Sequence, residues 1–209
     1  MPDPTRAAAW ALLCEWTKTQ ALRRHALSVE ASMRALARRA GVPAAEVETW
    51  GIVGMLHDFD YERYPSLEDH VFRGMEVLRE RGWPDAIVRA VGAHANYSGI
   101  AAETPMERAI VAADELSGFV GACALVRPSR SVRDLPPESV VKKMKDKTFA
   151  RGVDRGELRR GAELLGMPLA ELVAVVIEAQ KPLADLLGIG GGAAPDLADA
   201  PVPELPAGA

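Results

Sequence analysis

Apolar residues recur every three to four positions along most of the chain, which is the spacing that places side chains on one face of an α-helix. In the clearest stripe, Leu22, His25, Val29, Met33 and Leu36 follow one another at this spacing. Prolines and glycines separate the periodic segments at positions where helices usually begin or end. The pattern predicts helices over residues 7–16, 21–40, 43–57, 65–81, 84–94, 105–126, 138–150, 155–165 and 169–187. No segment alternates with period two for long enough to predict a strand, so we expect an all-α protein.

The helical pattern predicts one domain over residues 1–187, of which residues 138–187 form a helical C-terminal extension. A chain of 209 residues is long enough for one domain with a full core. From residue 188 onward the sequence consists mainly of Gly, Pro and Ala with scattered acidic residues. Such a composition buries little apolar surface, so we predict a disordered tail over residues 188–209.

The composition is that of an ordinary globular protein, with 48% hydrophobic and 26% charged residues. The two most apolar stretches, 109–126 and 169–179, each contain two acidic residues, so we expect no membrane span. The N-terminus lacks the basic-then-apolar pattern of a signal peptide, which predicts a cytoplasmic protein. Cys14 and Cys123 lie far apart without a CxxC motif, so we expect reduced thiols and no thiolate metal site.

Positive charge is concentrated in one segment of an otherwise acidic chain. Residues 127–160 hold eleven Lys or Arg and five Asp or Glu, a local charge of +6, whereas the whole chain carries −4. This segment indicates either an anionic substrate or partner, or simply a solvated helix face. The acidic total and the few aromatic residues argue against a nucleic-acid partner.

The four histidines and two of the aspartates lie in or beside apolar helix stripes. A carboxylate held among apolar side chains is costly unless it is paired or binds a metal. Each residue alone has an ordinary explanation, such as a hydrogen-bonded core histidine or a carboxylate paired with arginine. Together they indicate a site for one or two divalent transition metal ions, because imidazole and carboxylate donors suit Mn, Fe, Co, Ni or Zn better than calcium. The candidate metal ligands are His25, His57, Asp58, His70, His94 and Asp114.

Five segments within residues 25–126 and their immediate flanks carry a resemblance to a known family. In order, they are RRHALSVEASMRALARRAG, GMLHDFD, EDHVFRGMEVLRERG, VGAHANYSG and AIVAADELSGF. This order resembles the HD superfamily of metal-dependent phosphohydrolases, and SVVKKMKDKTFARGVDR resembles a stretch found in a group of small HD proteins. The resemblance implies a helical HD-domain bundle whose core motifs span residues 25–126.

The resemblance also implies the arrangement of the ligands. His25, His57, Asp58 and Asp114 would hold one metal, and Asp58 would bridge to a second metal that His70 and His94 complete. The implied activity is hydrolysis of a nucleotide or another small phosphate ester by a metal-activated water. The predicted catalytic residues are His57, Asp58 and Asp60.

One position departs from the family pattern. Many relatives follow the His-Asp pair with a small residue and a lysine that contacts phosphate, but here Asp60 and Tyr61 occupy these places. Either the basic segment supplies the positive charge, or the substrate is not a simple phosphate ester. Asp60 could orient a metal ligand, accept a proton or merely belong to a loop.

The candidate substrate contacts are basic residues and one tyrosine. Arginine offers phosphate a planar fork and lysine offers a point charge. The lysines could equally form a solvated face, and Tyr97 could pack against the core. The candidates are Arg24, Tyr97, Lys142, Lys143, Lys145 and Lys147.

Two other functions remain open at this point. The same ligand set in some HD-type proteins holds two irons that activate oxygen, and the missing phosphate lysine keeps this alternative in view. The other alternative is a non-catalytic nucleotide-binding regulatory module with a structural metal.

Overall fold

The computed structural model describes residues 4–198 and 200–205. This part of the chain forms nine α-helices and one short 3-10 helix, and its only β-type pairing is an isolated bridge between Ser131 and Gly190. The all-α prediction is therefore confirmed. No helix in this part of the chain combines the length and the apolar character that crossing a bilayer requires.

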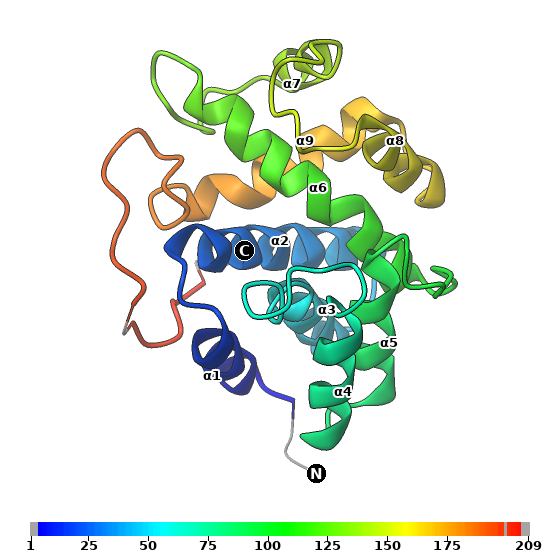
Figure 1. The fold of residues 1–209 in the computed structure, drawn as a ribbon. Helices are drawn as coiled ribbons and strands as arrows, with labels where there is room; N and C mark the ends of the chain where they lie inside the picture. The colour runs from blue at the N-terminus through cyan, green and yellow to red at the C-terminus, as the bar shows by residue number, and fades with distance from the viewer. Residues whose placement is uncertain (1–3, 199, 206–209) are drawn as a thin grey trace.

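A long buried helix, α2 (Gln20–Arg39), runs through the middle of the molecule (Figure 1). On one side it packs against α3 (Ala44–Leu56), which in turn packs against α1 (Arg6–Trp16). On the other side it packs against α6 (Pro105–Leu125) and α9 (Leu169–Gln180). Most side chains of α2 are buried as a result, which explains its strong apolar periodicity.

The remaining helices complete the two sides of α2. On the α3 side, α4 (Phe72–Glu80) packs against α5 (Asp85–His94), and α5 also contacts α3 and α6. On the α6 side, α7 (Pro137–Lys143) and α8 (Arg155–Leu164) pack against α6 and α9. The 3-10 helix η1 (Lys181–Leu183) extends α9. Helix α5 thus connects the two halves near one end of α2 (Figure 1).

The packing of α3 on α2 depends on a glycine. A Cβ built on Gly54 would lie 2.9 Å from the backbone N and Cα of Glu30, so only a residue without a side chain allows this approach of the two helices. Helix α2 carries His25 and α3 is followed directly by His57. The close approach of the two helices therefore helps to bring these histidines together.

The helix predicted over residues 65–81 begins later than expected. The chain runs through turns up to Val71, whose φ is 59°, and α4 starts only at Phe72. The Asp60 carboxylate accepts a hydrogen bond of 2.9 Å from the backbone N of Gly74, in the first turn of α4. A carboxylate in this position stabilises a helix N-terminus, so a distant residue contributes to where α4 begins.

Two later helices end earlier than predicted. The helix predicted over residues 138–150 stops at Lys143, and the Asp146 carboxylate then accepts hydrogen bonds from the backbone N and the hydroxyl of Thr148. The helix predicted over residues 169–187 becomes 3-10 at Lys181, next to Pro182, whose nitrogen carries no hydrogen to donate.

The predicted C-terminal tail forms no helix or strand over residues 188–198 and 200–205, apart from the bridge at Gly190. The expectation that it buries little apolar surface is wrong for Ile189 and Leu197, which are 5% and 1% exposed. The buried Arg23 donates to the carbonyl of Leu197, and the indole of Trp10 donates to the carbonyl of Ala200. Composition describes the average of a segment. It therefore does not predict that a few buried side chains and hydrogen-bonded carbonyls hold this segment against the helices. Residues 199 and 206–209 lie outside the described residues.

Candidate metal centre

The six predicted metal ligands come together near the junction of α2, α3, α5 and α6. Two of them, His25 and Asp114, project from within helices, and His94 is the last residue of α5. His57 directly follows α3, and His70 lies in the turn before α4 instead of on a helix as predicted. Helix ends and turns therefore supply several of the ligands.

Two sets of three residues could each hold a cation. In one set, ligand atoms of His25, His57 and Asp58 all lie within 4.8 Å of one another. In the other, atoms of Asp58, His70 and His94 satisfy the same limit. Asp58 belongs to both sets, with Oδ2 3.4 Å from His57 Nε2 and Oδ1 3.1 Å from His70 Nε2.

Asp114 adjoins the first of these sets. Its Oδ1 lies 3.1 Å from Nε2 of His25 and 3.2 Å from Nε2 of His57. The carboxylate comes from the apolar helix α6, so this helix contributes one charged group at the point where it passes the histidines.

Backbone carbonyls fix the orientation of two imidazoles. Nδ1 of His57 lies 2.8 Å from the carbonyl of Gly54, and Nδ1 of His94 lies 2.6 Å from that of Val91. A carbonyl can only accept, so Nδ1 carries the proton in both rings. In the neutral imidazoles the Nε2 atoms then keep their lone pairs, and these atoms face Asp58.

A buried carboxylate holds the third imidazole in the same way. Asp60 is fully buried, and its Oδ1 lies 3.0 Å from Nδ1 of His70. Its other oxygen accepts from the backbone of Gly74. Asp60 does not line the cavity, so the structure places this predicted catalytic residue behind His70, where it orients a ligand.

One nitrogen at the centre gives a direct test of whether a cation fits. Nε2 of His57 is buried and has no hydrogen-bond partner, although carboxylate oxygens of Asp114 and Asp58 lie 3.2 and 3.4 Å away. A buried nitrogen that faces carboxylate oxygens is satisfied by a proton or by a metal ion, so a cation fits at this position. The set of imidazole nitrogens and carboxylate oxygens fits Mn, Fe, Co, Ni or Zn.

The same proximity perturbs the titration of these groups. Burial alone would lower the pKa of His57, but the carboxylates of Asp58 and Asp114 raise it well above its usual range. Burial opposes the same effect at His70, where Asp58 and Asp60 raise the pKa to about 9. Burial would raise the pKa of Asp58, yet the histidines hold it well below its usual range. The groups are therefore strongly coupled through charge.

A cavity of about 430 Å³ opens beside the ligands. Tyr61 and Tyr97 line it and flank His70, with ring centroids 5.1 and 6.4 Å from the imidazole. Burial and the nearby carboxylates raise the pKa of Tyr97 to about 12, so its hydroxyl stays protonated. The volume suits a small-molecule ligand.

Comparisons with protein-family models, curated proteins and solved structures find no match.

Sequence reasoning missed two carboxylates in the cavity lining. Glu115 follows Asp114 on α6, and burial together with Asp114 raises its pKa to about 7. Its position in an apolar helix was a signal that could have singled it out. Glu157 on α8 accepts a hydrogen bond from Asn96, another residue of the lining, and no local pattern marks either residue.

The predicted substrate contacts are only partly brought to this cavity. Tyr97 lines it, whereas Arg24 lines a neighbouring cavity and donates to the carbonyl of Pro195. No Lys or Arg appears among the described residues that line the metal cavity. The predicted lysines that lie elsewhere, on α7 and the turn after it, are Lys142, Lys143, Lys145 and Lys147.

Proposed function

We propose that this chain is a metal-dependent phosphohydrolase that acts on a small phosphate ester, with nucleotides among the candidates. The observation that carries the proposal is the pair of ligand sets that share Asp58, one of which contains the unpartnered Nε2 of His57. The resemblance to the HD superfamily supports the same reading, because that family uses this order of ligands.

The ligands divide between one or two divalent transition metal ions. His25, His57, Asp58 and Asp114 would hold the first, and Asp58, His70 and His94 the second. Such ions, when bound, lower the pKa of a water molecule towards ~7 and offset the charge of a phosphoryl group.

The reaction would be hydrolysis of the phosphate ester, in which water replaces the alcohol at phosphorus. The water oxygen bonds to phosphorus, the ester P–O bond breaks, and the products are the alcohol and inorganic phosphate. Asp60 and the two backbone carbonyls hold the imidazoles in the tautomer that the ligands need. Glu115 lines the cavity and offers a carboxyl group that can exchange a proton with the leaving oxygen.

Metal analysis of untagged protein tests the proposal first. We expect about one or two equivalents of a transition metal in the wild type and a loss of metal in His57→Ala, with circular dichroism unchanged. Asp69→Asn is the control, because Asp69 is an exposed carboxylate in the turn before α4 and lies outside both ligand sets. Wild-type protein that neither contains nor takes up metal would refute the proposal.

A second assay addresses the reaction itself. Metal-loaded protein is incubated with nucleotides and simple phosphate esters, and the release of phosphate or of a nucleoside is measured. Turnover that His57→Ala abolishes and Asp69→Asn preserves supports the proposal. Tight nucleotide binding without turnover would instead support the regulatory alternative.

A di-iron oxygenase is the second candidate, and a specific observation favours it. The phosphate-binding lysine is replaced by Tyr61, and none of the described residues that line the cavity is a Lys or Arg. Iron after purification, a spin-resonance signal from a mixed-valent iron pair and oxygen consumption would favour this candidate over the hydrolase.

A further inference from the structure

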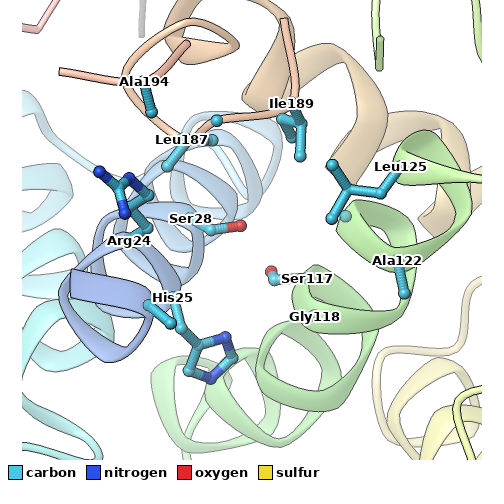
Figure 2. Close-up of a pocket in the computed structure, with 13 residues that line it drawn as sticks. Arg24, His25, Ser28, Ser117, Gly118, Ala122, Leu125, Leu187, Ile189 and Ala194 are labelled. Atoms are coloured by element: carbon cyan, nitrogen blue, oxygen red, sulfur yellow. The ribbon is translucent and has the colours of Figure 1, made fainter. Parts of the chain in front are cut away.

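A second cavity, of about 480 Å³, lies beside the metal centre between α2, α6 and the C-terminal segment (Figure 2). His25 and Gly118 line both this cavity and the metal cavity, so the two adjoin at these residues. A Cβ on Gly118 would lie 3.8 Å from the His25 ring, which shows how closely α6 passes this ligand. A ligand that extends past His25 would enter the second cavity.

The lining of this cavity differs in character from that of the metal cavity. Leu125, Leu187 and Ile189 contribute large apolar side chains, and glycines and alanines contribute most of the rest (Figure 2). The polar lining residues are Arg24, His25, Ser28 and Ser117. None of its described lining residues is acidic, and none is Phe, Tyr or Trp. The cavity therefore suits an apolar group, and its one aromatic ring is the imidazole of His25, which the metal site would already engage.

Two polar groups in this lining lack partners. Ser28 is 7% exposed, and its hydroxyl, which points towards α6 in Figure 2, makes no hydrogen bond within the described part of the chain. Nε of Arg24 is buried and likewise unpartnered. The Ser28 hydroxyl is therefore free to bond a polar group of a ligand, whereas the guanidinium of Arg24 already donates to the carbonyl of Pro195. Ser28 lies one helical turn after His25, near the metal end of the cavity.

We propose that this cavity holds the aliphatic chain of the substrate whose phosphate lies at the metal centre. The substrate class is then a phosphate monoester of a medium-length aliphatic alcohol. Ser28 would bind the polar part where it joins the chain. The lining of α2 extends from Ala21 to Ser28, about 10 Å along the helix, which sets the scale of the chain. The inference rests on the proposed function, because it assigns the phosphate to the metal ligands.

Binding of alkylphosphonates from methyl to octyl tests the inference, because hydrolysis does not cleave their C–P bond. The protein is loaded with Zn²⁺, which has no redox chemistry, and binding is measured by calorimetry. We expect affinity to rise about fourfold for each added methylene until the cavity is full. Adenosine monophosphate serves as the nucleotide comparison and should bind more weakly than octylphosphonate.

A pair of variants at Gly121 gives the matched control. Gly121 lines the cavity, and a Cβ there would lie 4.0 Å from Cγ2 of Ile189, which is an ordinary contact. Gly121→Ala should therefore keep the dependence on chain length. Gly121→Leu fills the cavity and should abolish the advantage of octylphosphonate while leaving methylphosphonate binding and zinc content unchanged. Ala122→Leu fills the same space if Gly121→Leu does not fold.

The outcomes separate this inference from the proposed function. Equal affinities for methyl- and octylphosphonate in the wild type, or an undiminished chain-length dependence in both leucine variants, would overturn the inference. Tighter binding of adenosine monophosphate would overturn it in favour of a nucleotide. If the wild type takes up no metal but Gly121→Leu still abolishes chain-length dependence, the aliphatic site stands and the hydrolase proposal fails.

Discussion

Asp60→Asn tests whether the buried carboxylate behind His70 sets the position of the proton on that imidazole. Asp60 accepts two hydrogen bonds, one of 3.0 Å from Nδ1 of His70 and one of 2.9 Å from the backbone N of Gly74. Asparagine has nearly the same shape but only one accepting oxygen, and its amide nitrogen donates. One of the two donors must therefore face another donor in the variant.

Either orientation of the asparagine weakens the second ligand set. If its amide nitrogen faces His70, the imidazole proton moves to Nε2, and that nitrogen no longer binds a cation. If it faces Gly74, a buried N–H loses its partner at a cost of about 1–3 kcal/mol. Changes to groups that orient a metal ligand weaken metal binding about 10- to 100-fold, which corresponds to about 1.4–2.7 kcal/mol.

A chelator competition at fixed Zn²⁺ measures this effect. Asp60→Asn should weaken binding at the set that contains His70 and leave the set that contains His25 and His57 near its wild-type affinity. Asp69→Asn is the matched control, since its carboxylate is 42% exposed and belongs to neither set. Identical binding curves for Asp60→Asn and the wild type would refute the reasoning that Asp60 controls the tautomer.

Three further predictions concern stability and reactivity. Gly54→Ala places a methyl group against the backbone of α2 and should lower the free energy of unfolding by about 1–3 kcal/mol, measured by urea denaturation. Arg23→Met removes a buried donor to the carbonyls of Leu197 and Thr17 and should lower the free energy of unfolding by about 1–3 kcal/mol, with faster hydrogen exchange around Leu197 and at the end of α1. Burial raises the pKa of Cys123 to about 11, so at pH 8 only about 0.1% is thiolate, and a thiol reagent should label the half-buried Cys14 well before Cys123. Equal labelling rates in the folded protein would contradict the last prediction.

Much of the helical architecture could be predicted because α2 is buried on most of its surface, and its stripe from Leu22 to Leu36 reflects that burial. Residues 65–71 could not be placed in the same way. The start of α4 depends on Asp60, which lies fourteen residues before Gly74 and carries no periodic signal of its own. Contacts between segments distant in sequence decide such boundaries, and periodicity does not describe them.

The candidate site was likewise predictable only in part. Periodicity indicated that the histidines face inward, and the resemblance to the HD superfamily implied which of them group around Asp58. The second cavity was not predictable, because Ser28, Gly121 and Ile189 meet only through the packing of α2, α6 and the C-terminal segment. The lysines of α7 were predicted to contact substrate but lie away from the metal cavity. A concentration of charge in the sequence does not indicate which surface of the fold carries it.

The hydrogen-bond acceptors that orient the imidazoles differ in whether a substitution can remove them. The carbonyls of Gly54 and Val91 belong to the main chain, so no change of side chain removes the acceptor of His57 or of His94, although a side chain at Gly54 would press against α2. The acceptor of His70 is the side chain of Asp60, which a single nucleotide change can alter. Two of these three imidazoles are thus oriented by main-chain acceptors, whereas the third depends on one carboxylate side chain.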